Sequence, residues 1–213
     1  MIDIAEKNIT HISLVRHGHV KNPDDIFYGR LPGFQLDSNG RAEAARAAEA
    51  LKTSRLDGVY SSPLLRTRQT AVEILKFHPH LKLKTSSLIT EVFTVFQGQP
   101  SNMLAPYAWD VYAGKDPEYE QPEDVMKRAN KFIRRIRKRH FGRHVVVVTH
   151  GDVILFAIFQ ANKIPVTAAN KINLNELGVL KNYPATGSIT TLTYQTADME
   201  EFPTVSYSAP SIK

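Results

Sequence analysis

Arginine and histidine side chains stand together at Arg16 and His17, where a short apolar run ends and a glycine follows. The run, residues 12–15, is typical of a buried strand, and such a strand commonly ends in the ligand crevice of an α/β sheet. A guanidinium fork can hold the oxygens of a tetrahedral anion while the neighbouring imidazole attacks phosphorus. Gly18 lets the backbone turn sharply and come close to a ligand. Taken alone, this common tripeptide is explained better by a strand-end histidine whose hydrogen bonds are satisfied.

Two later segments place similar residues after predicted strands. A strand at residues 56–60 leads through a serine–proline turn to Arg66, one turn into a helix. The β-branched run at residues 145–148, typical of a central strand buried on both faces, is followed by His150 and Gly151. Because parallel strands bring their carboxyl ends to one edge of a sheet, two arginines and two histidines are expected to converge there. A phosphoryl group matches this positive potential in size and charge.

The elements that position these residues alternate between strand and helix. Strands are predicted at residues 12–15, 56–60, 81–83, 145–148, 189–194 and 204–207, the last two being edge-type strands. Helices are predicted at residues 41–51, 63–75, 122–139 and 152–162. This order predicts an α/β three-layer sandwich, with a mostly parallel central sheet covered by helices on both faces. Since no repeat or second domain is visible, we expect one domain over residues 1–213. Residues 85–121 are predicted to form a lid with a short helix near 105–112.

Composition narrows the function classes. The 213 residues contain no cysteine, which excludes a disulfide scaffold, cysteine-ligated zinc and a cysteine-based phosphatase. The N-terminal residues lack a basic segment followed by an apolar one, so no signal peptide is expected. The longest apolar stretch, residues 145–159, is interrupted by polar side chains and is too short to span a bilayer. We therefore expect a cytoplasmic protein with no membrane partner.

A net charge of +6 favours an anionic partner, and much of the charge lies at residues 127–139. On a helix these basic residues leave Val125, Ala129, Phe132 and Ile136 on one face at helical spacing. This pattern favours a surface helix with a solvated basic face. No motif of a nucleic-acid-binding fold accompanies it, so no nucleic-acid partner is expected.

The motifs together resemble the histidine phosphatase superfamily, whose fold is phosphoglycerate mutase-like. The resemblance rests on the segments VRHG from Val15, SSPLLRTRQTA from Ser61 and VTHGD from Val148. A smaller match, LDSNGRA from Leu36, corresponds to the loop that leads into the family's first helix. These segments occur in the expected order and, taken together, span most of residues 10–160.

The resemblance implies that His17 becomes phosphorylated. Its attacking nitrogen must be unprotonated, with the N–H of the other nitrogen held by a backbone acceptor. Arg16 and Arg66 would hold the phosphoryl oxygens, most strongly as charge develops in the transition state. His150 would donate to the same oxygens. The predicted substrate-binding residues are Arg16, Gly18, Asn22, Arg30, Arg66, His150 and Gly151.

The leaving alkoxide needs a proton, and the family's acid follows the third strand, where this chain has Glu91. A carboxyl group beside phosphate has a raised pKa, which suits an acid that later activates water. Two features depart from this pattern. Residues 92–98 replace the family's glycine-rich continuation, and Asp152 is a second conceivable acid, although its place in a first helical turn suits a cap better.

Other polar and aromatic side chains leave alternatives open. His19 forms a His-x-His pattern with His17, but no carboxylate cluster supports a metal site, so neither a metal nor a cofactor is expected. Asn22 matches the family's substrate-side asparagine at an uncommon spacing. The candidate specificity residues are Tyr28, Arg30, Phe93, Phe96, Tyr107 and Trp109, and each fits a packing role equally well.

The predicted activity is that of a histidine acid phosphatase-like phosphomonoesterase acting on a small phosphorylated substrate. A phosphoglycerate mutase is the nearest alternative, but residues 92–121 do not resemble the longer mutase segment after the acid. A non-catalytic phospho-ligand binder is disfavoured because nucleophile, arginines and acid are all present. Both a monomer and a homodimer remain open.

Overall fold

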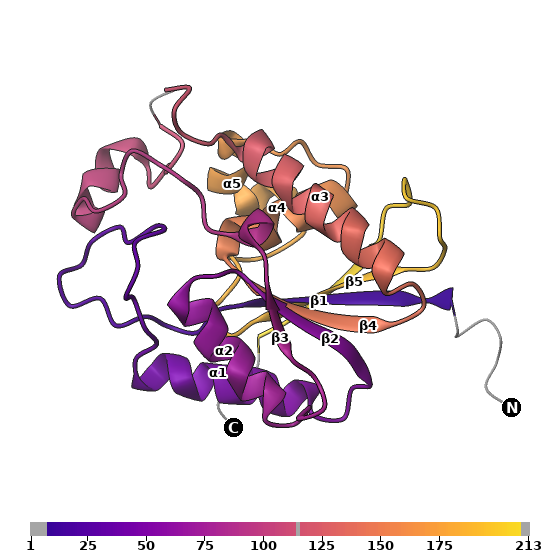
Figure 1. Cartoon of the computed structure of the whole chain (residues 1–213). Helices are drawn as coiled ribbons and strands as arrows, with labels where there is room; N and C mark the ends of the chain where they lie inside the picture. Colours follow the sequence, from indigo (N-terminus) through magenta and orange to yellow (C-terminus); the bar gives the residue numbers. More distant parts are fainter. Residues whose placement is uncertain (1–7, 114–115, 210–213) are drawn as a thin grey trace, which may run out of the picture.

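The fold is built around a single mixed sheet in the computed structural model, which describes residues 8–113 and 116–209 (Figure 1). Its strands are β1 (Thr10–Arg16), β2 (Leu56–Ser61), β3 (Leu83–Thr85), β4 (His144–Thr149), β5 (Ile189–Tyr194) and β6 (Thr204–Ser208). The order is β3-β2-β4-β1-β5-β6, in which β3, β2, β4 and β1 are parallel and β5 pairs antiparallel with both β1 and β6. The predicted mostly parallel α/β sandwich is confirmed. The predicted domain limits at 1 and 213, and residues 114–115 of the predicted lid, lie outside the described residues.

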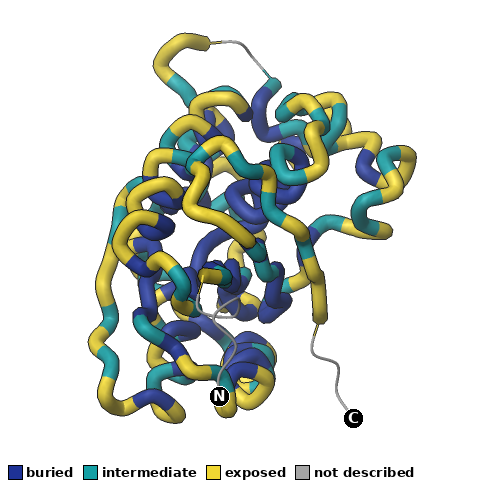
Figure 2. The backbone as a smooth tube through the Cα atoms, turned by 90° about the vertical axis from the view of Figure 1, so that its right-hand side faces the viewer, coloured by how far each residue is buried: buried dark blue, intermediate teal, exposed yellow. Residues whose placement is uncertain are grey.

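Helices cover both faces of this sheet. In Figure 1, α1 (Ser38–Leu51) and α2 (Leu65–Leu75) lie on one side, and α3 (Pro122–Arg139) and α4 (Gly151–Ala161) on the other. Because strand side chains alternate between faces, Leu14 and Val147 belong to the core under α3 and α4, whereas Val15 and Val148 belong to the core under α1 and α2. Figure 2 shows these buried segments inside a mostly exposed outer layer.

Local sequence explains where the helices begin. Asp37 caps α1 by accepting a hydrogen bond from the Gly40 backbone N–H at 2.8 Å. Helix α3 begins with Pro122 and has a capping box formed by Gln121 and Asp124. At the start of α2 the N-cap is Leu64, and no side chain caps it.

Several short elements differ from the predictions. Instead of an α-helix near 105–112, a 3₁₀ helix, η3, occupies Ser101–Tyr107 and contains Pro106, which cannot donate a helical hydrogen bond. Helices α5 (Ala168–Ile172) and η4 (Leu174–Leu177) were not predicted, because they are too short to show a helical periodicity in the sequence. Strand β5 is not an edge strand, since it pairs with both β1 and β6. In the described part of the chain, none of the helices is both long and apolar enough to cross a bilayer.

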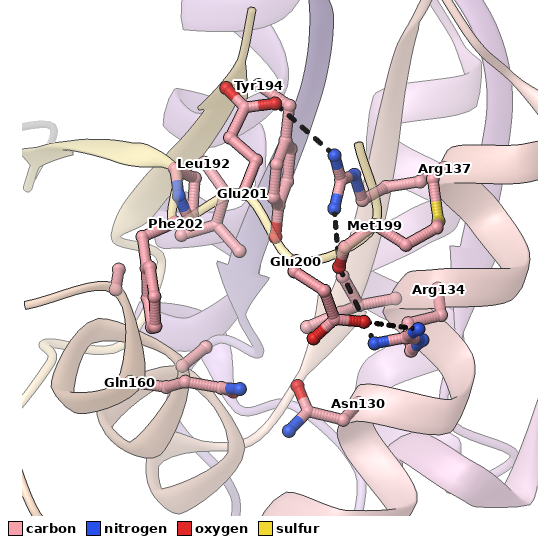
Figure 3. Close-up of a pocket in the computed structure, with 14 residues that line it drawn as sticks. Asn130, Arg134, Arg137, Gln160, Leu192, Tyr194, Met199, Glu200, Glu201 and Phe202 are labelled. Carbon is pink, nitrogen blue, oxygen red and sulfur yellow. Dashed lines mark hydrogen bonds and ion pairs between the residues drawn. The ribbon is translucent and has the colours of Figure 1, made fainter. Parts of the chain in front are cut away.

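The basic face of α3 is not simply solvated. Arg137 is only 3% exposed, and its guanidinium lies 3.7 Å from the ring centroid of Tyr194 in β5. It also pairs with Glu201 at 3.4 Å, while Arg134 pairs with Glu200 at 2.8 Å (Figure 3). The prediction of a solvated face is therefore wrong for Arg137. These contacts attach α3 to the connection between β5 and β6 around a cavity of about 130 Å³.

Candidate active site

Four predicted catalytic residues lie together at the carboxyl ends of the parallel strands, because His17 follows β1, Arg66 follows β2, Glu91 follows β3 and His150 follows β4. The rings of His17 and His150 lie 5.3 Å apart between centroids. Between them, Arg66 directs Nε to His17 Nε2 at 3.3 Å and Nη2 to His150 Nδ1 at 3.4 Å. The Glu91 carboxylate reaches His150 Nδ1 at 3.4 Å and Arg66 Nη2 at 3.9 Å. Residues from four separated parts of the chain thus surround one small volume.

His17 is held in the state that a nucleophile requires. Its Nδ1 lies 2.8 Å from the Gly18 carbonyl oxygen, which can only accept, so Nδ1 carries the proton and Nε2 offers its lone pair. Burial, followed by the positive charges of Arg66 and Arg16, lowers the His17 pKa well below its ordinary value. The imidazole, 1% exposed, is therefore neutral at neutral pH.

Both arginines leave binding capacity for an anion. Arg66 is 1% exposed, donates to the Gly29 carbonyl at 2.8 Å and lies over the ring of Tyr28. Arg16 donates to the Pro184 carbonyl at 2.6 Å, and its guanidinium lies over Tyr183 at 5.0 Å. In the described structure the buried Nε of Arg16 has no hydrogen-bond partner. Incompletely compensated guanidinium groups, buried in Arg66 and half-buried in Arg16, favour a bound anion.

The two candidate acids lie in opposite environments. Burial raises the pKa of Glu91, although Arg66 opposes the shift. Burial also acts to raise the pKa of Asp152, but Lys171 and the hydrogen bonds from Tyr112, Tyr183 and Lys171 outweigh it, so the net pKa is lowered. Asp152 is thus an ionised anchor for other side chains, and it caps no helix, because the N-cap of α4 is His150. Glu91 is the carboxyl group suited to donate a proton.

The two predicted site glycines, Gly18 and Gly151, are required by close packing. Neither has a positive φ, but a Cβ on Gly18 would lie 2.2 Å from the Gly40 carbonyl oxygen at the start of α1. A Cβ on Gly151 would lie 2.2 Å from the Tyr183 hydroxyl. Gly18 therefore lets β1 approach α1, and Gly151 lets Tyr183 cover Arg16.

Asn22 and Arg30 make contacts within the protein. The Asn22 amide donates to the Ile26 carbonyl and accepts from the Ile26 N–H, closing its own loop. The Arg30 guanidinium donates to the Glu91 carbonyl and to Glu120, both at 2.7 Å. Asn22 lines the cavity beside the site, whereas Arg30 is absent from that lining and supports the Glu91 backbone.

Sequence reasoning missed several side chains that complete the site. Ser62 lies with its Oγ 2.9 Å from His150 Nε2 and also accepts from the Leu64 N–H. Its position in the serine-rich motif before Arg66 was the available signal. Tyr183 and Lys171 gave no such signal, since they lie in a segment without recognisable pattern.

A metal ion is geometrically conceivable at this cluster. His17, Glu91 and His150 offer ligand atoms within 4.8 Å of one another. However, the Arg66 guanidinium lies among the same atoms, and its charge repels a cation. The residues fit an anion better.

A cavity of about 380 Å³ adjoins the cluster through Arg16 and Glu91. It is bounded by the loop of residues 20–37 and the η3 segment, which lie side by side at one end of the sheet (Figure 1). This volume falls within the range of small-molecule pockets, about 300–1,000 Å³.

Comparison with known proteins decides the family. The sequence profile of the histidine phosphatase superfamily (branch 1) matches residues 12–195. The chain belongs to this superfamily. Phosphoserine phosphatase 1 of Hydrogenobacter thermophilus is 32% identical over 152 residues, 64% of this chain and 69% of that protein. Phosphoglycerate mutase-like protein 4 of Arabidopsis thaliana is 30% identical over 164 residues, 71% of each chain.

Solved structures confirm the superfamily fold. The native mycobacterial glucosyl-3-phosphoglycerate phosphatase superposes with a TM-score of 0.77 at 24% identity, covering 95% of this chain and all of that one. Superfamily membership makes the chain a phosphatase- or mutase-type enzyme.

Proposed function

We propose that this chain is a histidine acid phosphatase-like phosphomonoesterase that acts on a small phosphorylated metabolite through a phosphohistidine at His17. The observation that carries the proposal is the grouping of His17, Arg66, His150 and Glu91, in which a neutral nucleophile faces the buried guanidinium group of Arg66, and the half-buried Arg16 lines the adjoining cavity. Phosphatase names among the relatives support the same reaction class.

In the first step the His17 Nε2 lone pair attacks phosphorus while the bond to the leaving oxygen breaks. The electron pair of that bond goes to the leaving oxygen, and Glu91 supplies its proton. Arg16 and Arg66 hold the equatorial oxygens, where negative charge is greatest in the transition state. His150 contributes one further donor.

In the second step water cleaves the phosphohistidine. The Glu91 carboxylate accepts a proton from water as the water oxygen bonds to phosphorus. The P–N bond breaks, its electron pair returns to His17 Nε2, and phosphate leaves. One carboxyl group thus acts in turn as acid and base.

Activity assays test this proposal. We expect hydrolysis of p-nitrophenyl phosphate in the presence of a chelator and loss of that activity in His17→Ala; full activity in the variant contradicts the proposal. The mutase alternative would convert 3-phosphoglycerate to 2-phosphoglycerate faster than it releases phosphate. A cytoplasmic location, independence of metals and cofactors, and the absence of a nucleic-acid partner stay predictions.

A further inference from the structure

The cavity beside the phosphoryl site has a mainly apolar wall. Its apolar lining residues are Ile26, Phe27, Val92, Leu104, Trp109 and Val111. Glu91 and Arg16 form the side toward His17, so a phosphate held by the arginines would direct its leaving group into this space. The wall therefore contacts the leaving group, which is the part of the substrate that differs between phosphomonoesters.

The charged side chains in this wall are already paired with other groups of the protein. Lys171 donates to Asp152 at 2.9 Å, and the same carboxylate accepts from the hydroxyl groups of Tyr112 and Tyr183. The Asn22 amide is bonded to its own loop. Arg16 and Glu91 act on the phosphoryl group in the proposed reaction. The other described lining residues therefore include no positively charged side chain without a partner that could bind a carboxylate of the leaving group.

Trp109 lies at the edge of this cavity in an unusual backbone conformation. Trp109 and the preceding Ala108 have φ values of 61° and 50°, the left-handed region that non-glycine residues rarely adopt. The turn directly follows η3, and the Trp109 N–H bonds back to the Leu104 carbonyl at 3.0 Å. The side chain is nevertheless 58% exposed, so burial of the indole does not explain why this strain is maintained.

We propose that the cavity selects phosphomonoesters whose leaving group is uncharged, largely apolar and planar, and that Trp109 is the specificity residue that stacks on this group. This inference rests on the proposed phosphatase function and specifies its substrate class. It disfavours phosphorylated carboxylic acids such as phosphoserine and phosphoglycerate.

Turnover of alkyl phosphates tests the selectivity, because their leaving groups have similar intrinsic reactivity. We expect kcat/KM for 2-phenylethyl phosphate to exceed the values for O-phosphoserine and 3-phosphoglycerate at least tenfold. Trp109→Ala should lower kcat/KM for 2-phenylethyl phosphate about fivefold through KM and leave ethyl phosphate within about twofold. Trp109→Phe should restore most of the loss. Tyr107→Ala is the matched control, because Tyr107 is also exposed on η3, packs against Phe96 and does not line the cavity.

A binding measurement separates this inference from the proposed function. Trp109 is the only tryptophan of the chain, so its fluorescence reports on the cavity without turnover. Titration with 2-phenylethylphosphonate should change the fluorescence of the unmodified protein and of Tyr107→Ala at lower concentrations than 3-phosphonopropionate does. A fluorescence response to the phosphonate, combined with no phosphorylation of His17 by 2-phenylethyl phosphate, would overturn the phosphatase proposal and leave the apolar selectivity standing. Equal binding of the two phosphonates, or preferred turnover of the carboxylates, would overturn the selectivity alone.

Discussion

Glu91 and Asp152 show how one type of side chain takes two roles within one site. Both carboxyl groups are largely buried, but Glu91 has Arg66 only at 3.9 Å, whereas Asp152 accepts three hydrogen bonds from Lys171 and two tyrosines. Their pKa values consequently move in opposite directions, up for Glu91 and down for Asp152. Because the two pKa values are moved apart, the group with the raised pKa, Glu91, is suited to donate a proton, and the group with the lowered pKa, Asp152, remains an anion that holds other side chains in place.

The pH profile of kcat/KM follows from these shifts. His17 must be unprotonated, and its pKa lies well below 6.5, so activity should persist as the pH falls through 6.5. Glu91 must be protonated, and its pKa is raised above 4.5, so activity should decline as the pH rises through that raised value. Glu91→Gln should lower kcat on an alkyl phosphate about 10²- to 10³-fold and remove this decline. Protonation of the substrate phosphate affects the unmodified enzyme and Glu91→Gln equally. Identical pH profiles of the two proteins would therefore contradict the assignment of Glu91 as the acid.

The packing of two elements fixes the orientation of Arg16. Tyr183 precedes β5, covers the guanidinium at the end of β1 and touches Gly151 at the start of α4. Its hydroxyl also donates to Asp152 at 2.6 Å. Gly151 at the start of α4 therefore leaves room for Tyr183, and the Tyr183 ring in turn positions Arg16 at the end of β1.

Substitution of Gly151 tests this arrangement. In Gly151→Ala the new Cβ would overlap the Tyr183 ring, displace it and leave Arg16 without its stacking partner. We expect kcat/KM to fall at least about tenfold, the loss typical of a misplaced binding group. Tyr183→Phe keeps the ring over Arg16 and should lose less. Steady-state kinetics on one aryl phosphate would measure both variants, and a larger loss in Tyr183→Phe would contradict the positioning role.

For the molecule as a whole, histidines buried in the neutral state couple folding to pH. Burial lowers the pKa of His144, at the start of β4, to about 4, with smaller effects from His11 and His78. Below pH 6.5 the unfolded chain takes up a proton that the folded His144 refuses, so stability falls as the pH drops from 6.5 toward 4.

Denaturant unfolding should therefore show a His144 contribution. Between pH 7.5 and pH 4.5 the free energy of unfolding should fall about 2 kcal/mol more in the unmodified protein than in His144→Gln. The glutamine keeps a hydrogen-bonding group near Ser13, which contacts His144 Nε2 at 2.8 Å. Equal pH dependence in the two proteins would exclude His144 as a source.

The sequence pattern predicted the parallel part of this fold and the main reactive cluster. Strand ends marked by Arg16, His17 and His150 could be recognised because a buried apolar run leads directly into polar chemistry. The surroundings could not be predicted in the same way. The contact of the Ser62 hydroxyl with His150 and the ion pair of Arg30 with Glu120 both depend on where these residues lie in space. Tertiary contacts of this kind leave no local periodicity.

Trapping the covalent intermediate tests the central claim most directly. The protein would be mixed with ³²P-labelled aryl phosphate, quenched within milliseconds and digested for peptide mapping. We predict an acid-labile, base-stable label on the peptide containing His17, formed before phosphate release, and no label in His17→Ala. Burst-free hydrolysis with no label on His17, or a label on another residue, would contradict the account.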